Sequence, residues 1–152
     1  MIAASCRFMS MIPRRGALCG HPAARQDAVR QEVRGHLRRI IRRIRTHWPT
    51  TNITIRGESH CGRREVMDWC EDNGLDYVFG LSGNEFLAAA LKVQADDIRT
   101  RRAMEQAPVL RGYTQTNYAA KSWKCERRVC ARIEATELGL DIRFVVTNIT
   151  NG

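Results

Sequence analysis

The sequence lacks several features that would place it in a familiar class. No apolar run approaches the ~18–20 residues that a membrane-spanning helix requires. The first twenty residues have no basic start followed by a continuous apolar stretch, so no secretory signal is expected. Neither Gly-rich phosphate-binding pattern occurs, which argues against a nucleotide-binding enzyme. We therefore expect a cytoplasmic protein without a membrane partner.

The cysteines offer little evidence of a structural metal site. They lie at positions 6, 19, 61, 70, 125 and 130, and no two of them have the C-x-x-C spacing of a zinc knuckle. We expect reduced thiols. A metal site could be assembled from His60, Cys61 and Cys70, but incidental thiols are favoured.

A hydrolytic triad could be assembled from Ser59, His60 and Asp76, but no nucleophile-elbow pattern surrounds Ser59.

Acidic residues are scarce in the first part of the chain. The 152 residues carry 25 Lys and Arg and 16 Asp and Glu, a net charge of +9. Residues 1–57 hold 12 basic and 2 acidic residues, and residues 58–152 hold 13 basic and 14 acidic residues. All of the excess positive charge therefore lies before residue 58. It predicts a polyanionic partner for that part, with a solvated helix face as the alternative.

Residues 25–48 have the periodicity of an amphipathic α-helix that ends before Pro49. Its apolar stripe is formed by Val29, Val33, Leu37, Ile40, Ile41, Ile44 and Trp48. Basic residues cover the other faces, and those expected to contact DNA phosphates are Arg38, Arg39, Arg42, Arg43 and Arg45. Residues 1–24 show no periodicity, so we expect them to be irregular and poorly ordered.

Strand and helix patterns alternate after this helix. We expect a strand at residues 52–57, a helix at 62–73 with Val66, Trp69 and Cys70 inward, and a strand at 75–81. Asn84 is placed to cap a further helix that runs to about Glu105. This alternation favours an α/β layer with parallel strands over residues 25–107.

From residue 108 the hydrophobic period changes to two. Between residues 122 and 138 one alternate set is mostly charged, and the inward set is Trp123, Cys125, Arg127, Val129, Ala131 and Ile133. Further strands are expected at 110–118 and 140–148. This pattern predicts antiparallel ribbons over residues 108–152, with one side in water.

Glu58 directly follows the first predicted strand. In α/β folds a carboxylate at the carboxyl end of a strand is often a metal ligand or a catalytic group. The alternative is an acid at a helix start, which the helix dipole favours. One carboxylate alone cannot hold a catalytic divalent ion, because two-metal phosphoryl transfer needs several carboxylates from different elements.

Four segments, in this order and spacing, resemble the central part of bacterial insertion-sequence transposases with a DDE catalytic domain. They are RRIRTHWP, ITIRGES, EVMDWCEDNGLDYVFGLSGN and YAAKSWKCERRVCARIEATELGLDIRFVVTNI. The resemblance runs from about Arg38 to Asn148, and it implies a truncated α/β ribonuclease-H-like core with an antiparallel β insertion toward the C-terminus. It also implies DNA strand cleavage and transfer with Mg²⁺ in the intact family.

The resemblance gives Glu58 a specific position. In the family a strand ends in Arg-x-Asp-Ser-Gly-Phe, and the Asp is the second of three metal-binding acids. That Asp matches Glu58, and the following Gly and Phe match His60 and Cys61. The first family Asp has no match within residues 1–37, and no match to the last Glu is found up to Gly152.

We therefore expect an internal piece of a DDE-type transposase that is catalytically inactive. Glu58 is its one candidate catalytic and metal-binding residue, and no Mg²⁺ is expected to bind to this chain. DNA is the expected partner, and a homodimer is expected of the intact family. The alternatives are a non-catalytic remnant that binds DNA without sequence preference through its basic helix, and an inert fragment.

Overall fold

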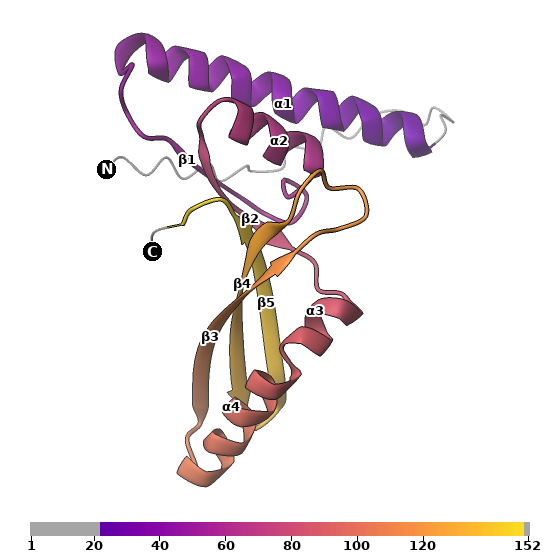
Figure 1. Cartoon of the computed structure of the whole chain (residues 1–152), viewed down its shortest axis with the longest axis vertical. Helices are drawn as coiled ribbons and strands as arrows, with labels where there is room; N and C mark the ends of the chain where they lie inside the picture. The colour runs from indigo at the N-terminus through magenta and orange to yellow at the C-terminus, as the bar shows by residue number, and fades with distance from the viewer. Residues whose placement is uncertain (1–21, 151–152) are drawn as a thin grey trace, which may run out of the picture.

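The computed structural model describes residues 22–150, and the side chains of residues 33–150 (Figure 1). Four helices and five strands follow one another along this part of the chain. They are α1 (Pro22–His47), β1 (Thr54–Gly57), α2 (Arg64–Asp72), β2 (Asp76–Leu81), α3 (Glu85–Ala90), α4 (Lys92–Glu105), β3 (Val109–Tyr118), β4 (Arg127–Thr136) and β5 (Gly139–Thr147). None of these helices is long and apolar enough to cross a membrane.

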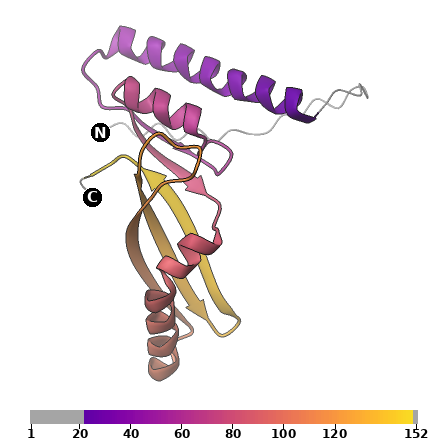
Figure 2. The same cartoon turned by 45° about the vertical axis from the view of Figure 1, so that its right-hand side comes forward.

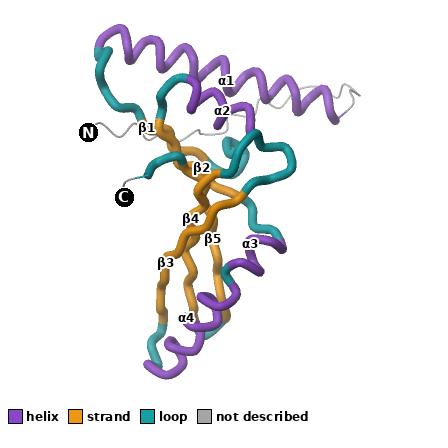
Figure 3. The backbone as a smooth tube through the Cα atoms, viewed as in Figure 1, coloured by secondary structure: helices purple, strands orange, loops and turns teal. Residues whose placement is uncertain are grey.

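The five strands form one sheet in the order β1-β2-β5-β4-β3, drawn in orange in Figure 3. β1 and β2 are parallel and are connected by α2, whereas the other neighbouring pairs are antiparallel. β5 pairs with both β2 and β4, so the antiparallel ribbons extend the sheet that the parallel pair begins. The expected α/β class is confirmed, with a sheet that is mostly antiparallel.

The helices pack on one face of this sheet. α4 lies along β3 and β4, α2 packs on β2, and α1 crosses α2 at the other end of the molecule (Figures 1 and 2). The core between these layers includes the fully buried side chains of Tyr77, Phe79, Met67, Val129 and Val146. It is the alternate strand residues that point toward the helices, so the period of two in the sequence marks the buried face.

The helix boundaries differ from the expectations in three places. α1 begins at Pro22, so residues 22–24 are helical rather than irregular, and the prediction for residues 1–21 lies outside the described residues. Trp48 was expected on the buried stripe, but it is 56% exposed because it lies beyond the last helical residue. The single helix expected up to Glu105 is interrupted at Leu91, between α3 and α4.

Several local expectations are confirmed. Asn84 caps α3, and its side chain accepts a hydrogen bond from the Leu87 N–H at 2.9 Å. In α2 the side chains of Val66, Trp69 and Cys70 are buried. In β4 the alternate residues from Arg127 to Ala135 are buried, but the strand begins at Arg127, so Cys125 lies in the preceding loop.

Candidate functional site

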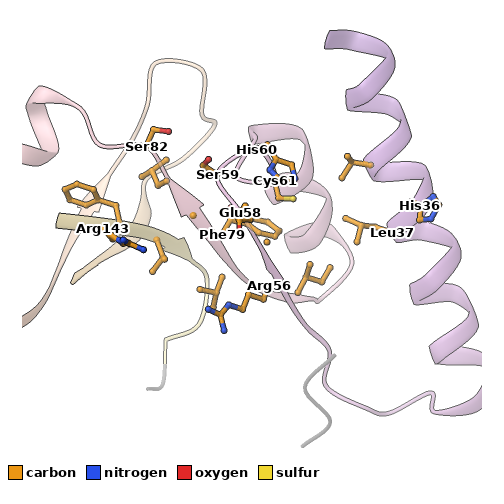
Figure 4. A pocket seen from close by; sticks show the side chains of 18 of the residues that line it. His36, Leu37, Arg56, Glu58, Ser59, His60, Cys61, Phe79, Ser82 and Arg143 are labelled. Carbon is orange, nitrogen blue, oxygen red and sulfur yellow. The ribbon is translucent and has the colours of Figure 1, made fainter. Parts of the chain in front are cut away.

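Glu58 lies in a tight turn at the carboxyl end of β1 (Figure 4). The Cys61 N–H donates to the Glu58 carbonyl at 2.8 Å, which closes the turn. Two glycines let this turn sit against the sheet. A Cβ at Gly57 would lie 2.7 Å from the Cβ of Cys61, and one at Gly80 would lie 2.9 Å from the backbone nitrogen of Ser59. The sequence thus fixes Glu58 at the edge where β1 and β2 both end.

This turn borders a cavity of about 1120 Å³ between α1, the ends of β1 and β2, and the middle of β5. Much of the wall is apolar, with side chains such as Leu37, Ile55 and Phe79. The charged, histidine and cysteine side chains around it are His36, Arg56, Glu58, His60, Cys61 and Arg143. Glu58 is the one carboxylate among the described residues that line the cavity, and its side chain is exposed.

The donors near Glu58 do not fit a magnesium site. Mg²⁺ requires oxygen ligands in octahedral geometry, and its protein sites are built on carboxylates. Among the described side chains, those of residues 33–150, no three His, Cys, Asp or Glu are grouped so that they could hold a metal ion. Burial raises the pKa of the Cys61 thiol, although its hydrogen bond at the Glu58 backbone acts in the opposite direction. Cys61 is therefore a neutral thiol, which is a poor ligand.

The basic face of α1 is arranged as the sequence predicted. Val33, Leu37, Ile41 and Ile44 pack against the core and hold the helix to the molecule. The side chains on the outer faces are exposed, namely Arg38, Arg39, Arg42, Arg43 and Arg45. Arg45 donates to the Asn73 carbonyl at 3.0 Å. The other four form no ion pair with the described residues.

A second group of charges was missed at the sequence level. Arg127 on β4 is 5% exposed, and it donates to both carboxylate oxygens of Glu71 at 2.7 and 2.8 Å and to Asp68 at 2.7 Å. The Tyr77 hydroxyl donates to Glu71 at 2.7 Å, and the guanidinium lies 5.4 Å from the centre of the Trp123 ring. This cluster ties α2 to β2 and β4. The sequence could have predicted this cluster, because the strand pattern places Arg127 on the buried face and a buried arginine needs a carboxylate partner.

The cluster changes the pKa values of both acids. Hydrogen bonds from Arg127 hold the pKa of Glu71 below its ordinary value of 4.5. Burial alone would raise the pKa of Asp68, but hydrogen bonds from Arg127 and Lys124 together lower it below 3.8. Both carboxylates are thus ionised at neutral pH. They are engaged with basic side chains and leave no free set of oxygens for a metal ion.

A comparison with protein-family models matches residues 22–152 to the transposase DDE domain, group 1. The chain belongs to this family. The resemblance that the four segments carried is confirmed at the level of the family. A search of curated proteins found no match, and neither did a search of solved structures.

Membership of this family associates the chain with DNA transposition and with DNA as its partner. Transposases of this family use a divalent metal ion. The expectation that Glu58 takes a catalytic position stays a prediction, because the structure brings no second carboxylate to it among the described residues.

Proposed function

We propose that this chain is a ribonuclease-H-like transposase domain of the insertion-sequence type that holds DNA through α1 and does not cut it at Glu58. The observation that carries the proposal is the set of four exposed arginines on α1, Arg38, Arg39, Arg42 and Arg43, which have no carboxylate partner among the described residues. DNA presents a dense row of phosphates, and guanidinium groups bind phosphate oxygens in a planar, bidentate geometry.

The packing of α1 supports this assignment. Like charges four residues apart, as in the pairs Arg38–Arg42 and Arg39–Arg43, disfavour an isolated helix by roughly 0.2–0.5 kcal/mol per pair. The apolar stripe around Ile41, which is 8% exposed, offsets that cost. The arginines thus stay on a helix that is fixed to the core, and a polyanion would relieve their repulsion.

The ribonuclease-H-like assignment rests on the order β1-α2-β2, in which a helix joins two parallel strands and Glu58 follows the first strand. The absence of cleavage rests on the donors around Glu58. A substituted and isolated carboxylate lacks the several carboxylates from different elements that two-metal phosphoryl transfer requires.

Fluorescence anisotropy with a labelled duplex, at two salt concentrations, tests the DNA contact. Counterion release lowers log affinity with log salt, with a slope of about −0.9 per phosphate that is neutralised. We expect a slope that corresponds to several phosphates, affinity on the order of micromolar or weaker, and little sequence preference. Replacing Arg38, Arg39, Arg42 and Arg43 with Gln should weaken binding and flatten the slope.

A matched control removes the same charge elsewhere. Lys92, Arg99, Arg101 and Lys121 are exposed and lie outside α1, so their replacement with Gln also lowers the net charge by four. This control should keep most of the duplex affinity. If both variants lose affinity equally, the binding follows net charge and α1 is not the contact surface.

A further inference from the structure

The face of the sheet that points away from α2 and α4 carries another basic surface. Its residues alternate with the core residues along each strand. They include Arg56 on β1, Arg128 and Arg132 on β4, Arg143 on β5 and Tyr113 on β3, and the register places Arg132 between Arg143 and Tyr113. The helices α2 and α4 pack on the opposite face of the sheet, and Arg56 and Arg143 also line the cavity beside α1.

These side chains surround a hollow of about 850 Å³ in the twisted sheet. We call them the outer arginine face, which consists of Arg56, Arg128, Arg132, Arg143, Tyr113 and Gln115. The face joins residues of four strands, β1, β3, β4 and β5. Because β4 and β5 each pair with a strand on both sides, the floor of the hollow is continuous hydrogen-bonded sheet.

The outer arginine face has more positive than negative charge. Asp141 contacts Arg143 at 2.9 Å and Arg132 at 3.4 Å, and Glu134 lies 3.8 Å from Arg132 and 2.6 Å from Arg111, so two carboxylates serve three arginines. Arg128 donates to a neutral partner, the Ile149 carbonyl, at 2.6 Å. Arg56 is exposed and forms no ion pair with any described residue. A ligand in this hollow therefore meets uncompensated guanidinium groups.

Tyr113 distinguishes this surface from the basic face of α1. It is 77% exposed, although an aromatic ring with this exposure gains little from the fold itself. An exposed ring among arginines on an open sheet suits single-stranded nucleic acid, because unpaired bases stack on aromatic rings while cations hold the phosphates. The bases of a duplex are already stacked on one another and cannot use the ring.

We propose that the outer arginine face binds single-stranded nucleic acid, with its arginines on the phosphates and Tyr113 stacked on a base. This surface lies on the strands and contains none of the arginines of the basic face of α1, although Arg56 and Arg143 also line the cavity beside that helix, and it goes beyond the duplex contact proposed above. The two contacts can fail independently, because they lie on different elements and favour different forms of the ligand.

The test uses the full chain with Arg38, Arg39, Arg42 and Arg43 replaced by Gln, so that α1 contributes little. Its ligands are a fluorescent oligothymidine of about 12 nucleotides, within the range of single-strand site sizes, and the matching duplex. In this background the oligothymidine should bind more tightly than the duplex. Tyr113→Leu should then weaken oligothymidine binding at least about fivefold, the effect of losing a weak stacking contact.

Two further variants separate stacking from charge. Tyr113→Phe keeps the ring and should bind within about twofold of the background chain, because stacking needs only the π-face. Arg56→Gln combined with Arg143→Gln should weaken binding and lower the salt slope by about 0.7 per lost phosphate contact. Phe86→Leu removes an exposed ring on α3, outside the proposed surface, and should change nothing.

Several results would overturn the proposal. Equal affinity for single strand and duplex would show that the ring takes no part, as would unchanged binding in Tyr113→Leu. A labelled polyglutamate that competes as well as the oligothymidine would assign the face to acidic proteins instead. Thermal melting of each variant, with an unchanged midpoint, shows that a lost affinity does not come from unfolding.

Discussion

Glu58 and Glu71 are two carboxylates in opposite situations. Glu58 lies at the carboxyl end of β1, is exposed and has no ion pair among the described residues. Glu71 lies on α2, accepts two hydrogen bonds from Arg127 and one from Tyr77, and shares the guanidinium with Asp68. The acid that we predict to take the family's catalytic position has no charged partner among the described residues, whereas Glu71 and Asp68 connect the layers of the structure.

The difference shows that a carboxylate at the end of a strand is not by itself a metal site. A catalytic metal site needs converging carboxylates whose own geometry is fixed by neighbouring groups. At Glu58 the backbone geometry is present, since Gly57 and Gly80 hold the turn against the sheet, but the converging acids are not found among the described residues. At Glu71 the acids and their partners are present, and a buried arginine occupies the place between them.

Among the variants considered, the largest loss of unfolding free energy should come from replacing Arg127. Arg127→Met leaves Asp68 and Glu71 without their partner on the inner face of the sheet, and breaking a buried pair in this way costs about 3–5 kcal/mol. Because the Glu71 side chain keeps 30% of its exposure, we expect about 2–4 kcal/mol of lost unfolding free energy, measured by urea denaturation.

Two variants serve as controls for the loss expected in Arg127→Met. Arg99→Met removes an arginine whose side chain is 66% exposed, and Glu58→Ala removes the isolated acid. Each should change the unfolding free energy by less than about 0.5 kcal/mol. A loss in Glu58→Ala as large as that in Arg127→Met would mean that the turn after β1, too, is held by its carboxylate.

The cluster of Arg127, Glu71 and Asp68 also predicts that the stability of the fold decreases at acidic pH. The pKa values of Glu71 and Asp68 are lower in the folded state, so the unfolded chain binds more protons as the pH falls. The stability that the two acids contribute is present above their ordinary values of 4.5 and 3.8 and is lost as the pH falls through the lower folded values. Thermal midpoints between neutral pH and about pH 3 should therefore fall more steeply in the native chain than in Arg127→Met. Parallel profiles would show that other groups control acid unfolding.

A smaller loss of unfolding free energy should follow from removing the hydroxyl of Tyr77. Tyr77→Phe deletes the hydrogen bond to Glu71 at 2.7 Å but keeps the ring, which stacks on Phe79 with centroids 4.9 Å apart. A hydrogen bond to a charged group contributes about 1.5–3 kcal/mol, and because Glu71 is also held by Arg127 we expect the lower part of this range. Urea denaturation measures it, with Tyr113→Phe, an exposed tyrosine, as the control. A loss no greater than that of the control would remove Tyr77 from the cluster.

Part of this structure follows directly from the sequence. The period of 3.6 in α2 identified Val66, Trp69 and Cys70 as buried, and the period of two in β4 placed Arg127 on the inner face. These properties depend on neighbours along one element, which a sequence shows. Val33, Leu37, Ile41 and Ile44 of the predicted stripe of α1 pack against the core, whereas Trp48 does not, because the helix has already ended there. The side chain of Val29 lies outside the described residues.

Other features depend on contacts that no local pattern records. The partners of Arg127 lie 56 and 59 residues away, so the cluster depends on how α2 docks against β2 and β4. The pairing of β5 with β2, which joins the two kinds of strand pairing into one sheet, depends on the whole topology. The family position of Glu58 came from the resemblance, and its exposure and lack of neighbouring carboxylates came from the structure.

Added magnesium should have the smallest effect on the thermal stability of the chain. Only a ligand that binds the folded state raises its stability, and the donors around Glu58 do not form a magnesium site. Millimolar Mg²⁺ should leave the thermal midpoint unchanged in the native chain and in Glu58→Ala. A saturable rise that disappears in Glu58→Ala would show that Glu58 does hold an ion, and the contrast with Glu71 would then lose its basis.

Whether the chain holds DNA without cutting it can be read from one sample. An end-labelled duplex is incubated with the chain in Mg²⁺, and bound and cleaved DNA are separated on native and denaturing gels. We predict a retarded complex that salt dissociates, with the strands intact and with the same result for Glu58→Gln. Cleaved strands that disappear in Glu58→Gln would contradict the proposal, because they would make Glu58 a catalytic residue.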